Sequence, residues 1–336
     1  MPRRYLNAIR AMPVRRHPAS RRFACALGPT CLAVLLLPAA LLTAPFAQAQ
    51  DLGHKLLGGV GIDAGVQAEP GFYLIDRIVR YDASRLRDRN GNLVPIRGLN
   101  IDVVANAFGA SLTLKPEDAP YLGFAFGLPL ADISVNANDP RIAVDRSGFA
   151  DIFVQPLKLG WRLPRGDVVT SYAFYAPTGR FDPRGRAGVG RGFWSHQFSL
   201  GGAIFAGRER QIRASALLSY DINLRKRDID IRRGNTLQIQ GGAGVRFVRI
   251  VDIGIAGFAL WQVTDDSGAD VPPMLRGARD RVYGLGPEIG LLVPPLRTRL
   301  ELRAEWDFGV RSRPQGRILV AGLAVALWRP APPGQR

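Results

Sequence analysis

The stretch RTRLELRAEWDF, residues 297–308, carries a charged side chain at every odd position and an uncharged one at every even position. A period of two is the period of a β-strand, because successive side chains leave opposite faces of the sheet. One face of this strand is therefore wholly ionic, and the other is apolar with two aromatic rings at one end. A soluble sheet with one solvated face fits this pattern, and so does a strand between lipid and a watery lumen.

The same alternation recurs along the chain, and we find no stretch with sustained helical periodicity after Gln50. Segments such as RQIRASALLSYDI (210–222) and YLGFAFGLPL (121–130) are apolar along the whole of one face. Most of these strands have 10 to 16 residues, whereas a globular strand usually has about five or six and a tilted transmembrane strand needs about 9 to 11. Twelve strands are predicted, at 72–82, 99–114, 121–135, 148–162, 167–176, 193–206, 210–222, 236–247, 249–263, 281–293, 297–309 and 317–328.

The connections between these strands alternate between long and short. ASRLRDRNGNLVPIRG (83–98) is followed by KPEDAP (115–120), and PTGRFDPRGRAGVGRG (177–192) is followed by GRE (207–209). Outer-membrane barrels have long loops outside the cell, short periplasmic turns and an even number of strands. The pattern predicts an all-β protein, a transmembrane antiparallel β-barrel of about twelve strands over residues 72–328.

The first 49 residues have the composition of an export signal. Seven arginines and no acidic residue occupy positions 1–22, and an uncharged apolar run then leads to the small-residue site Ala47-Gln48-Ala49. An inner-membrane anchor is the alternative, but prolines at 29, 38 and 45 interrupt a run that is already short. We expect a signal peptide at 1–49, starting at Met1 or Met12, a short periplasmic segment at 50–71 and a C-terminal tail at 329–336.

Both cysteines lie in this leader, so the mature chain has none and must be held by its own core or by a membrane. Without the seven leader arginines the formal charge falls from +17 to +10. An exported chain of this charge is expected to meet anionic lipid headgroups or anionic solutes rather than nucleic acid. The expected partners are outer-membrane lipid and lipopolysaccharide, a small-molecule solute and the outer-membrane assembly machinery.

Charged side chains on the presumed inner face are the candidate pore lining. The strands on either side of 297–308 place mainly small residues on that face, so long arginines have room to lie between them. The candidates are Lys158, Arg162, Arg213, Asp221, Arg246, Glu288, Arg297, Arg299, Glu301, Arg303, Glu305 and Asp307. Seven cations against five anions predict a modest preference for small anions, such as aromatic carboxylates.

Several motifs between residues 145 and 325 resemble the bacterial outer-membrane family linked to the meta-cleavage pathway of phenol degradation. They include GFADIFVQPLKLGWRL (148–163), Pro177-Thr178-Gly179, Trp194 and VYGLGPEIGLL (282–292). The resemblance implies a β-barrel that passes hydrophobic or aromatic compounds inward for degradation. It implies no assigned functional residues.

Other chemistries find little support. With two histidines, His54 and His196, and no cysteine in the mature chain, a zinc site of ordinary spacing is excluded, and no metal or cofactor is expected. Ser195 and His196 suggest a lipid hydrolase, yet adjacent residues on a strand point to opposite faces, so no catalytic residues are assigned. The glycine-rich stretches precede no helix, and the arginine-rich runs 184–192 and 224–233 lack interleaved base-stacking aromatics. These runs are expected to be solvated outer loops or to bind lipopolysaccharide phosphates.

Passive uptake of small, aromatic or hydrophobic compounds, anions among them, is therefore the expected function. Two alternatives remain from other classes: an outer-membrane lipid hydrolase that uses His196, and a structural or adhesive barrel with a closed lumen.

Overall fold

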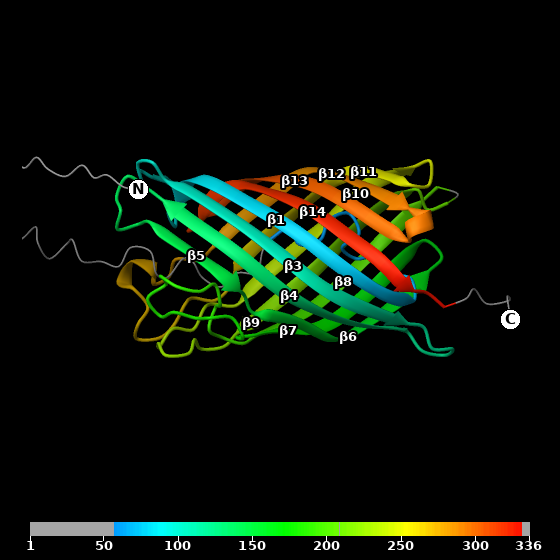
Figure 1. Ribbon diagram of the computed structural model, residues 1–336, viewed down its shortest axis with the longest axis horizontal. Helices are drawn as coiled ribbons and strands as arrows, with labels where there is room; N and C mark the ends of the chain where they lie inside the picture. Colours follow the sequence, from blue (N-terminus) through cyan, green and yellow to red (C-terminus); the bar gives the residue numbers. More distant parts are fainter. Residues whose placement is uncertain (1–56, 208, 331–336) are drawn as a thin grey trace, which may run out of the picture. The chain divides into compact units, whose positions relative to one another are not determined.

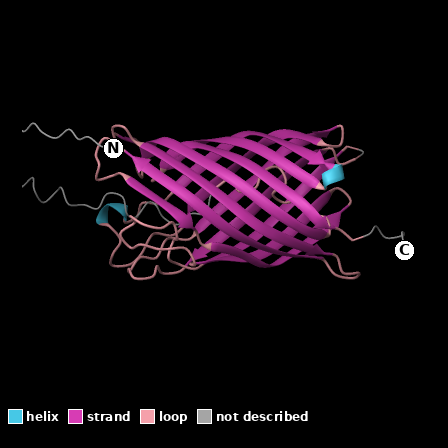
Figure 2. Cartoon of the chain, in the orientation of Figure 1, coloured by secondary structure: helices cyan, strands magenta, loops and turns pink. Residues whose placement is uncertain are grey.

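The computed structural model of this protein describes residues 57–207 and 209–330. The predicted signal peptide, His54 and the end of the predicted tail lie outside the described residues. Twelve long antiparallel strands close into a barrel, with two short strands at one end (Figures 1 and 2). The strands are β1 (Gly71–Arg87), β2 (Leu93–Val94), β3 (Asn100–Leu114), β4 (Tyr121–Asn136), β5 (Val144–Phe149), β6 (Ile152–Leu163), β7 (Gly166–Ala176), β8 (Ser195–Ala206), β9 (Ile212–Asn223), β10 (Thr236–Phe247), β11 (Val251–Gln262), β12 (Arg281–Val293), β13 (Thr298–Arg311) and β14 (Pro314–Trp328).

Pairing of the first strand with the last closes the barrel. β1 and β14 run antiparallel from Phe72↔Trp328 to Leu86↔Pro314, and every other long strand pairs with its neighbours in sequence order. The short strand β2 pairs with the end of β1, and β5 pairs with the end of β4. The predicted twelve-stranded antiparallel barrel is confirmed.

The alternation in 297–308 separates lipid from lumen. On β13, the side chains of Leu300, Leu302 and Trp306 lie on the outer surface, and those of Arg303 and Glu305 are buried. This is the reverse of a soluble protein, in which apolar side chains are buried and charges are exposed. The outer apolar side chains match a barrel whose exterior faces hydrocarbon.

Long loops gather at one end of the barrel, as predicted. Residues 177–194, 224–235 and 263–280 connect strands at the end where β1 finishes, and two to six residues make most turns at the other end. The β13–β14 connection is an exception at the long-loop end, because only Ser312 and Arg313 form it. Within the described residues no helix is long and apolar enough to cross a membrane.

The segment before β1 departs from the prediction. Residues 50–71 were expected in the periplasm, but the described part, 57–70, lies inside the barrel, where Leu57 and Ile62 are buried. Its sequence, LGGVGIDAGVQAEP, allows this position because its small residues fit between inward-facing side chains. A substituent at Gly61, for example, would collide with Glu288 and Arg303. We call residues 57–70 the lumen segment.

The outer face of β13 gives a first prediction. Replacing Leu302 with arginine puts a cation against lipid and should destabilise the barrel by about 2–4 kcal/mol if the residue lies near the bilayer midplane. Leu302→Met keeps the side chain apolar and serves as the control. Urea unfolding of the two variants in lipid vesicles measures the difference, and equal stabilities would show that this face does not contact hydrocarbon.

Candidate functional site in the barrel lumen

Charged side chains from neighbouring strands meet in the lumen as ion pairs. On β13, Arg299 pairs with Asp252 of β11, and Glu301 pairs with Arg77 of β1 at 3.1 Å. Asp307 accepts a hydrogen bond from the Tyr81 hydroxyl at 3.1 Å. The alternating charges of β13 are therefore largely neutralised by other strands of the barrel wall.

Eleven of the twelve predicted lining residues have side chains on the inner face of the barrel. Arg297 does not, and its assignment is wrong. It lies in the turn before β13 and follows the short helix Pro294–Leu296, with a left-handed backbone (φ 50°). The turn at Pro294-Pro295 makes β13 begin one residue later than the sequence pattern suggested.

A buried ionic group at mid-lumen joins the wall to the lumen segment. The Arg303 guanidinium lies 3.1 Å from the Glu288 carboxylate and 3.6 Å from Glu305, and all three side chains are at most 1% exposed. Arg303 also donates to the Gly58 carbonyl, and the Ile62 backbone N–H donates to Glu288 at 3.1 Å. Arg303 was expected to line a pore, but the lumen segment covers it.

A second ionic group lies nearer the short-turn end. Asp252, which is fully buried, accepts hydrogen bonds from Arg213, Arg246 and Arg299. Asp63 of the lumen segment pairs with Arg213 and Arg299 at 2.8 and 2.7 Å. Three guanidinium groups thus share two carboxylates, which leaves this part of the lumen with an excess of positive charge.

The remaining charges predicted in the lining occupy other parts of the inner wall. Arg162 pairs with Glu69 and donates to the Gln67 carbonyl at 2.9 Å. Lys158 lies beside Gly123, where a larger residue would crowd its side chain. Asp221 accepts from Gln197 at 2.7 Å.

Uncharged polar residues form an inner surface that the predicted list omits. β8, β9 and β10 place serines, glutamines and a threonine inward, and these side chains are at most 8% exposed. They are Ser195, Gln197, Ser199, Ser219, Thr236, Gln238 and Gln240. The alternation in the sequence places them on this face, but the predicted pore-lining residues were all charged ones.

The lumen segment is held along much of its length. The Ser215 hydroxyl donates to the Ile62 carbonyl at 2.7 Å, and the Gln67 N–H donates to Asp167 at 3.0 Å. Gly65 lies so close to Gly202 of β8 that a Cβ at position 65 would overlap the Gly202 backbone. The segment therefore depends on a glycine at this contact.

Leu57 packs into an apolar cluster on the inner side of the barrel. The cluster combines residues of β1, β11, β12, β13 and β14. Its members are Leu57, Val79, Phe258, Leu260, Val282, Val310, Ile318 and Val320. The inner wall is thus not uniformly polar, and apolar burial adds to the ionic contacts that retain the segment.

Residues that carry the family resemblance fold the long loop 177–194. The Asp151 carboxylate accepts from the backbone N–H groups of Gly179 and Arg191 at 3.1 and 3.0 Å and pairs with the Arg191 side chain. Gly179 packs directly against Gly190, where a side chain on either would overlap backbone. These residues have a structural role at the long-loop end.

The loop between β9 and β10 packs against loop 177–194. The Lys226 ammonium lies 5.5 Å from the ring centre of Phe181 and 5.9 Å from that of Phe193. Burial, with the nearby positive charge of Arg233, lowers the pKa of Lys226 to about 8. Phe193 is 1% exposed beneath these loops.

The arrangement around His196 does not support a Ser195–His196 pair. Ser195 faces inward and donates to Asn223 at 2.7 Å, whereas the His196 ring contacts Tyr172 at 2.8 Å on the other face of β8. Phe198, two residues along on that face, is half exposed. In the part of the chain that the structure describes, no group of three or more potential ligands is placed to hold a metal ion.

The contact at Gly65 gives a second prediction. Gly65→Ala should loosen the lumen segment and raise single-channel conductance, because the new methyl group cannot share the space of the Gly202 backbone. Gly127→Ala is the control, since its Cβ would make only ordinary contacts, at 3.7 Å or more. Planar-bilayer recordings would contradict this role of the segment if both variants conducted like the wild type.

The buried pair at mid-lumen gives a third. Arg303→Met leaves the Glu288 carboxylate without its guanidinium partner and should cost about 3–5 kcal/mol. Arg303→Met combined with Glu288→Gln removes the uncompensated charge and should recover part of that loss. Urea unfolding of the wild type, the two single variants Arg303→Met and Glu288→Gln and the double variant measures the coupling, and additive effects would exclude a direct interaction.

Comparisons with known proteins agree with this architecture. The family model described as "Putative MetA-pathway of phenol degradation" matches residues 83–320. The solved structure of an outer membrane channel from Pseudomonas putida F1 is similar, with a TM-score of 0.70 and 12% identity, over 81% of this chain and 100% of that chain. This likeness supports the outer-membrane barrel fold.

Two other solved structures are more distant. The CymD monoaromatic hydrocarbon channel has a TM-score of 0.42 and 8% identity, over 79% of this chain and 90% of that chain. The transport unit of the autotransporter AIDA-I from Escherichia coli has a TM-score of 0.46 and 11% identity, over 78% and 92%. Both likenesses are too weak to carry an argument.

No curated protein matches this chain. The family match covers well over half of the sequence and includes most of the barrel. The chain therefore belongs to this family of outer-membrane β-barrels, which is linked to the degradation of phenol.

Proposed function

We propose that this protein is an outer-membrane channel for passive entry of small solutes, with aromatic compounds as the substrate class. The family's link to phenol degradation and the solved channel from Pseudomonas putida F1 support transport rather than enzymatic chemistry. The observation that carries the proposal is the excess of positive charge around Asp252, where three arginines share two carboxylates, because a lumen that only held the barrel together could pair every charge.

The lumen segment is the gate of this channel in our proposal. It occupies the lumen through contacts that can be exchanged for water or solute, such as the Asp63 ion pairs and the Ser215 hydrogen bond. It is continuous with β1 at Gly71, so it can be displaced without opening the barrel wall. Solute would then pass the arginines around Asp252.

These arginines favour anions over cations of similar size. Aromatic carboxylates combine such a charge with a ring that can lie against Phe258 or Leu260 of the apolar cluster. We therefore place aromatic anions ahead of neutral aromatics as substrates.

A structural barrel with a closed lumen is the second candidate function. The burial of Leu57 and Ile62 and the contacts of Gln67 favour it, because they fill the lumen between the strands. The two candidates differ in whether the lumen segment moves, and conductance distinguishes them.

Ion selectivity tests the proposed path. Replacing Arg246 and Arg299 together by glutamine should lower the anion-to-cation permeability ratio, and Asp252 would keep Arg213 as a partner. A matched control replaces Arg249 and Arg297, which lie in short turns outside the lumen lining. Reversal potentials across a salt gradient report the ratio, and equal ratios in the two double variants would place the Asp252 arginines outside the conduction path.

A further inference from the structure

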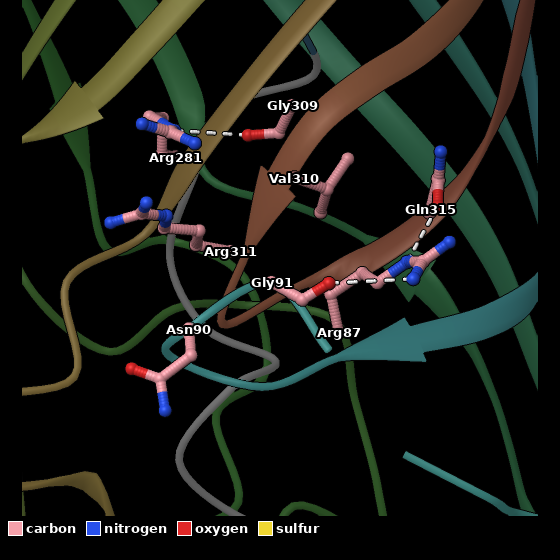
Figure 3. Close-up of a pocket in the computed structure, with 8 residues that line it drawn as sticks. All are labelled: Arg87, Asn90, Gly91, Arg281, Gly309, Val310, Arg311 and Gln315. Carbon is pink, nitrogen blue, oxygen red and sulfur yellow. Dashed lines mark hydrogen bonds between the residues drawn. The ribbon is translucent and has the colours of Figure 1, made fainter. Parts of the chain in front are cut away.

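A cavity at the long-loop end of the barrel is lined by arginines that are not part of the ionic groups in the lumen. It has a volume of about 280 Å³ and lies between the β1–β2 hairpin and the ends of β12, β13 and β14 (Figure 3). Its lining includes Arg87, Arg281, Arg311, Asn90 and Gln315.

Uncharged groups hold two of these arginines. Arg87 donates to the Gln315 side chain at 2.8 Å and to the Gly91 carbonyl at 3.3 Å, and Arg281 donates to the Gly309 carbonyl at 3.0 Å. Among residues 57–207 and 209–330, none of the three forms an ion pair with a carboxylate. The arginine-rich loops differ, since Arg191, Arg225 and Arg233 each pair with an aspartate.

Two of these arginines also oppose each other directly. Arg281 of β12 and Arg311 of β13 are cross-strand partners in the register. Like charges in this position destabilise a sheet unless something neutralises them. An anion between the guanidinium groups would relieve the repulsion, and guanidinium binds phosphate through paired, charge-assisted hydrogen bonds.

The cavity opens on the outer wall of the barrel. The Arg281 guanidinium lies 5.5 Å from the ring centre of Tyr283, and that ring packs against Trp261 and the half-exposed Phe308. Aromatic residues on the outer wall mark the boundary between hydrocarbon and headgroups. The arginines therefore lie just beyond this boundary, at the level of the headgroups of the outer leaflet.

We infer that Arg281 and Arg311 form a binding site for a phosphate group of an outer-leaflet lipid, the phosphorylated glycolipid of lipopolysaccharide, while Arg87 lines the opposite side of the cavity beside Gln315 (Figure 3). The site's position on the wall favours a lipid headgroup over a solute on its way to the lumen. Loop 88–92 completes the site, because the Ser312 N–H donates to the Asp88 carbonyl and holds this loop beside β13.

Lipid binding to the purified full-length protein tests the inference. Arg281→Gln combined with Arg311→Gln should weaken binding of diphosphorylated lipid A in nanodiscs by about tenfold or more. The control, Arg141→Gln with Arg225→Gln, removes two arginines at the same end that already have aspartate partners, and it should bind like the wild type. The shift in gel mobility on boiling confirms that each variant has folded.

Two further probes identify the group that is bound. Removing the phosphates of lipid A should weaken its binding to the wild type as much as the double substitution weakens binding of diphosphorylated lipid A. If the wild type binds both lipids equally tightly, the phosphate site is overturned. If inorganic phosphate binds the arginines and diphosphorylated lipid A does not, the lipid assignment is overturned. Conductance is measured separately, so failure here leaves the proposed channel to be judged by its own test.

Discussion

The hydrogen-bonded pairing of β1 with β14 closes the barrel, and without this closure neither the lumen nor the lipid-facing wall could form. In hydrocarbon an unpaired backbone group costs several kcal/mol, so a sheet can cross a membrane only when it has no free edge. The register from Phe72↔Trp328 to Leu86↔Pro314 meets that condition over almost the whole of β1. Closure also forces alternate side chains into an enclosed space, and the ionic lumen is the consequence.

An enclosed space lined with charges must neutralise them internally, and the lumen segment takes part in this. Asp63 supplies a carboxylate to arginines of β9 and β13, and backbone groups of Gly58 and Ile62 satisfy Arg303 and Glu288. The same contacts that complete the ionic groups obstruct the lumen. The stability of this arrangement and the opening of a path are therefore coupled.

The sequence predicted the barrel closely because alternation and loop length follow directly from a closed sheet between lipid and water. The bounds predicted for 236–247 and 281–293 agree with β10 and β12. The lumen segment could not be predicted in this way, since LGGVGIDAGV has no period of two and its position depends on contacts with strands far away in the sequence, such as β8, β9 and β13. Asp63 gave no signal for the same reason, whereas Gln238 and Ser219 could have been found from their place in the alternation.

The arginines of the cavity at the long-loop end and those of the lumen lie on opposite sides of the barrel wall, and both need anionic partners. Arg281 begins β12 and Arg311 ends β13, just past the outward aromatic rings, where a lipid phosphate would supply the anion. Inside the barrel the chain itself supplies the carboxylates. The two sets of arginines thus differ in the source of their anionic partners.

Entry of a membrane-impermeant aromatic anion, 4-sulfobenzoate, into vesicles that contain the protein tests the proposed channel directly. A channel selective for aromatic anions should make these vesicles swell faster in 4-sulfobenzoate than protein-free vesicles do, and faster than in an aromatic cation of similar size. Swelling at the rate of protein-free vesicles, with the protein shown to be inserted and folded, would contradict a channel role.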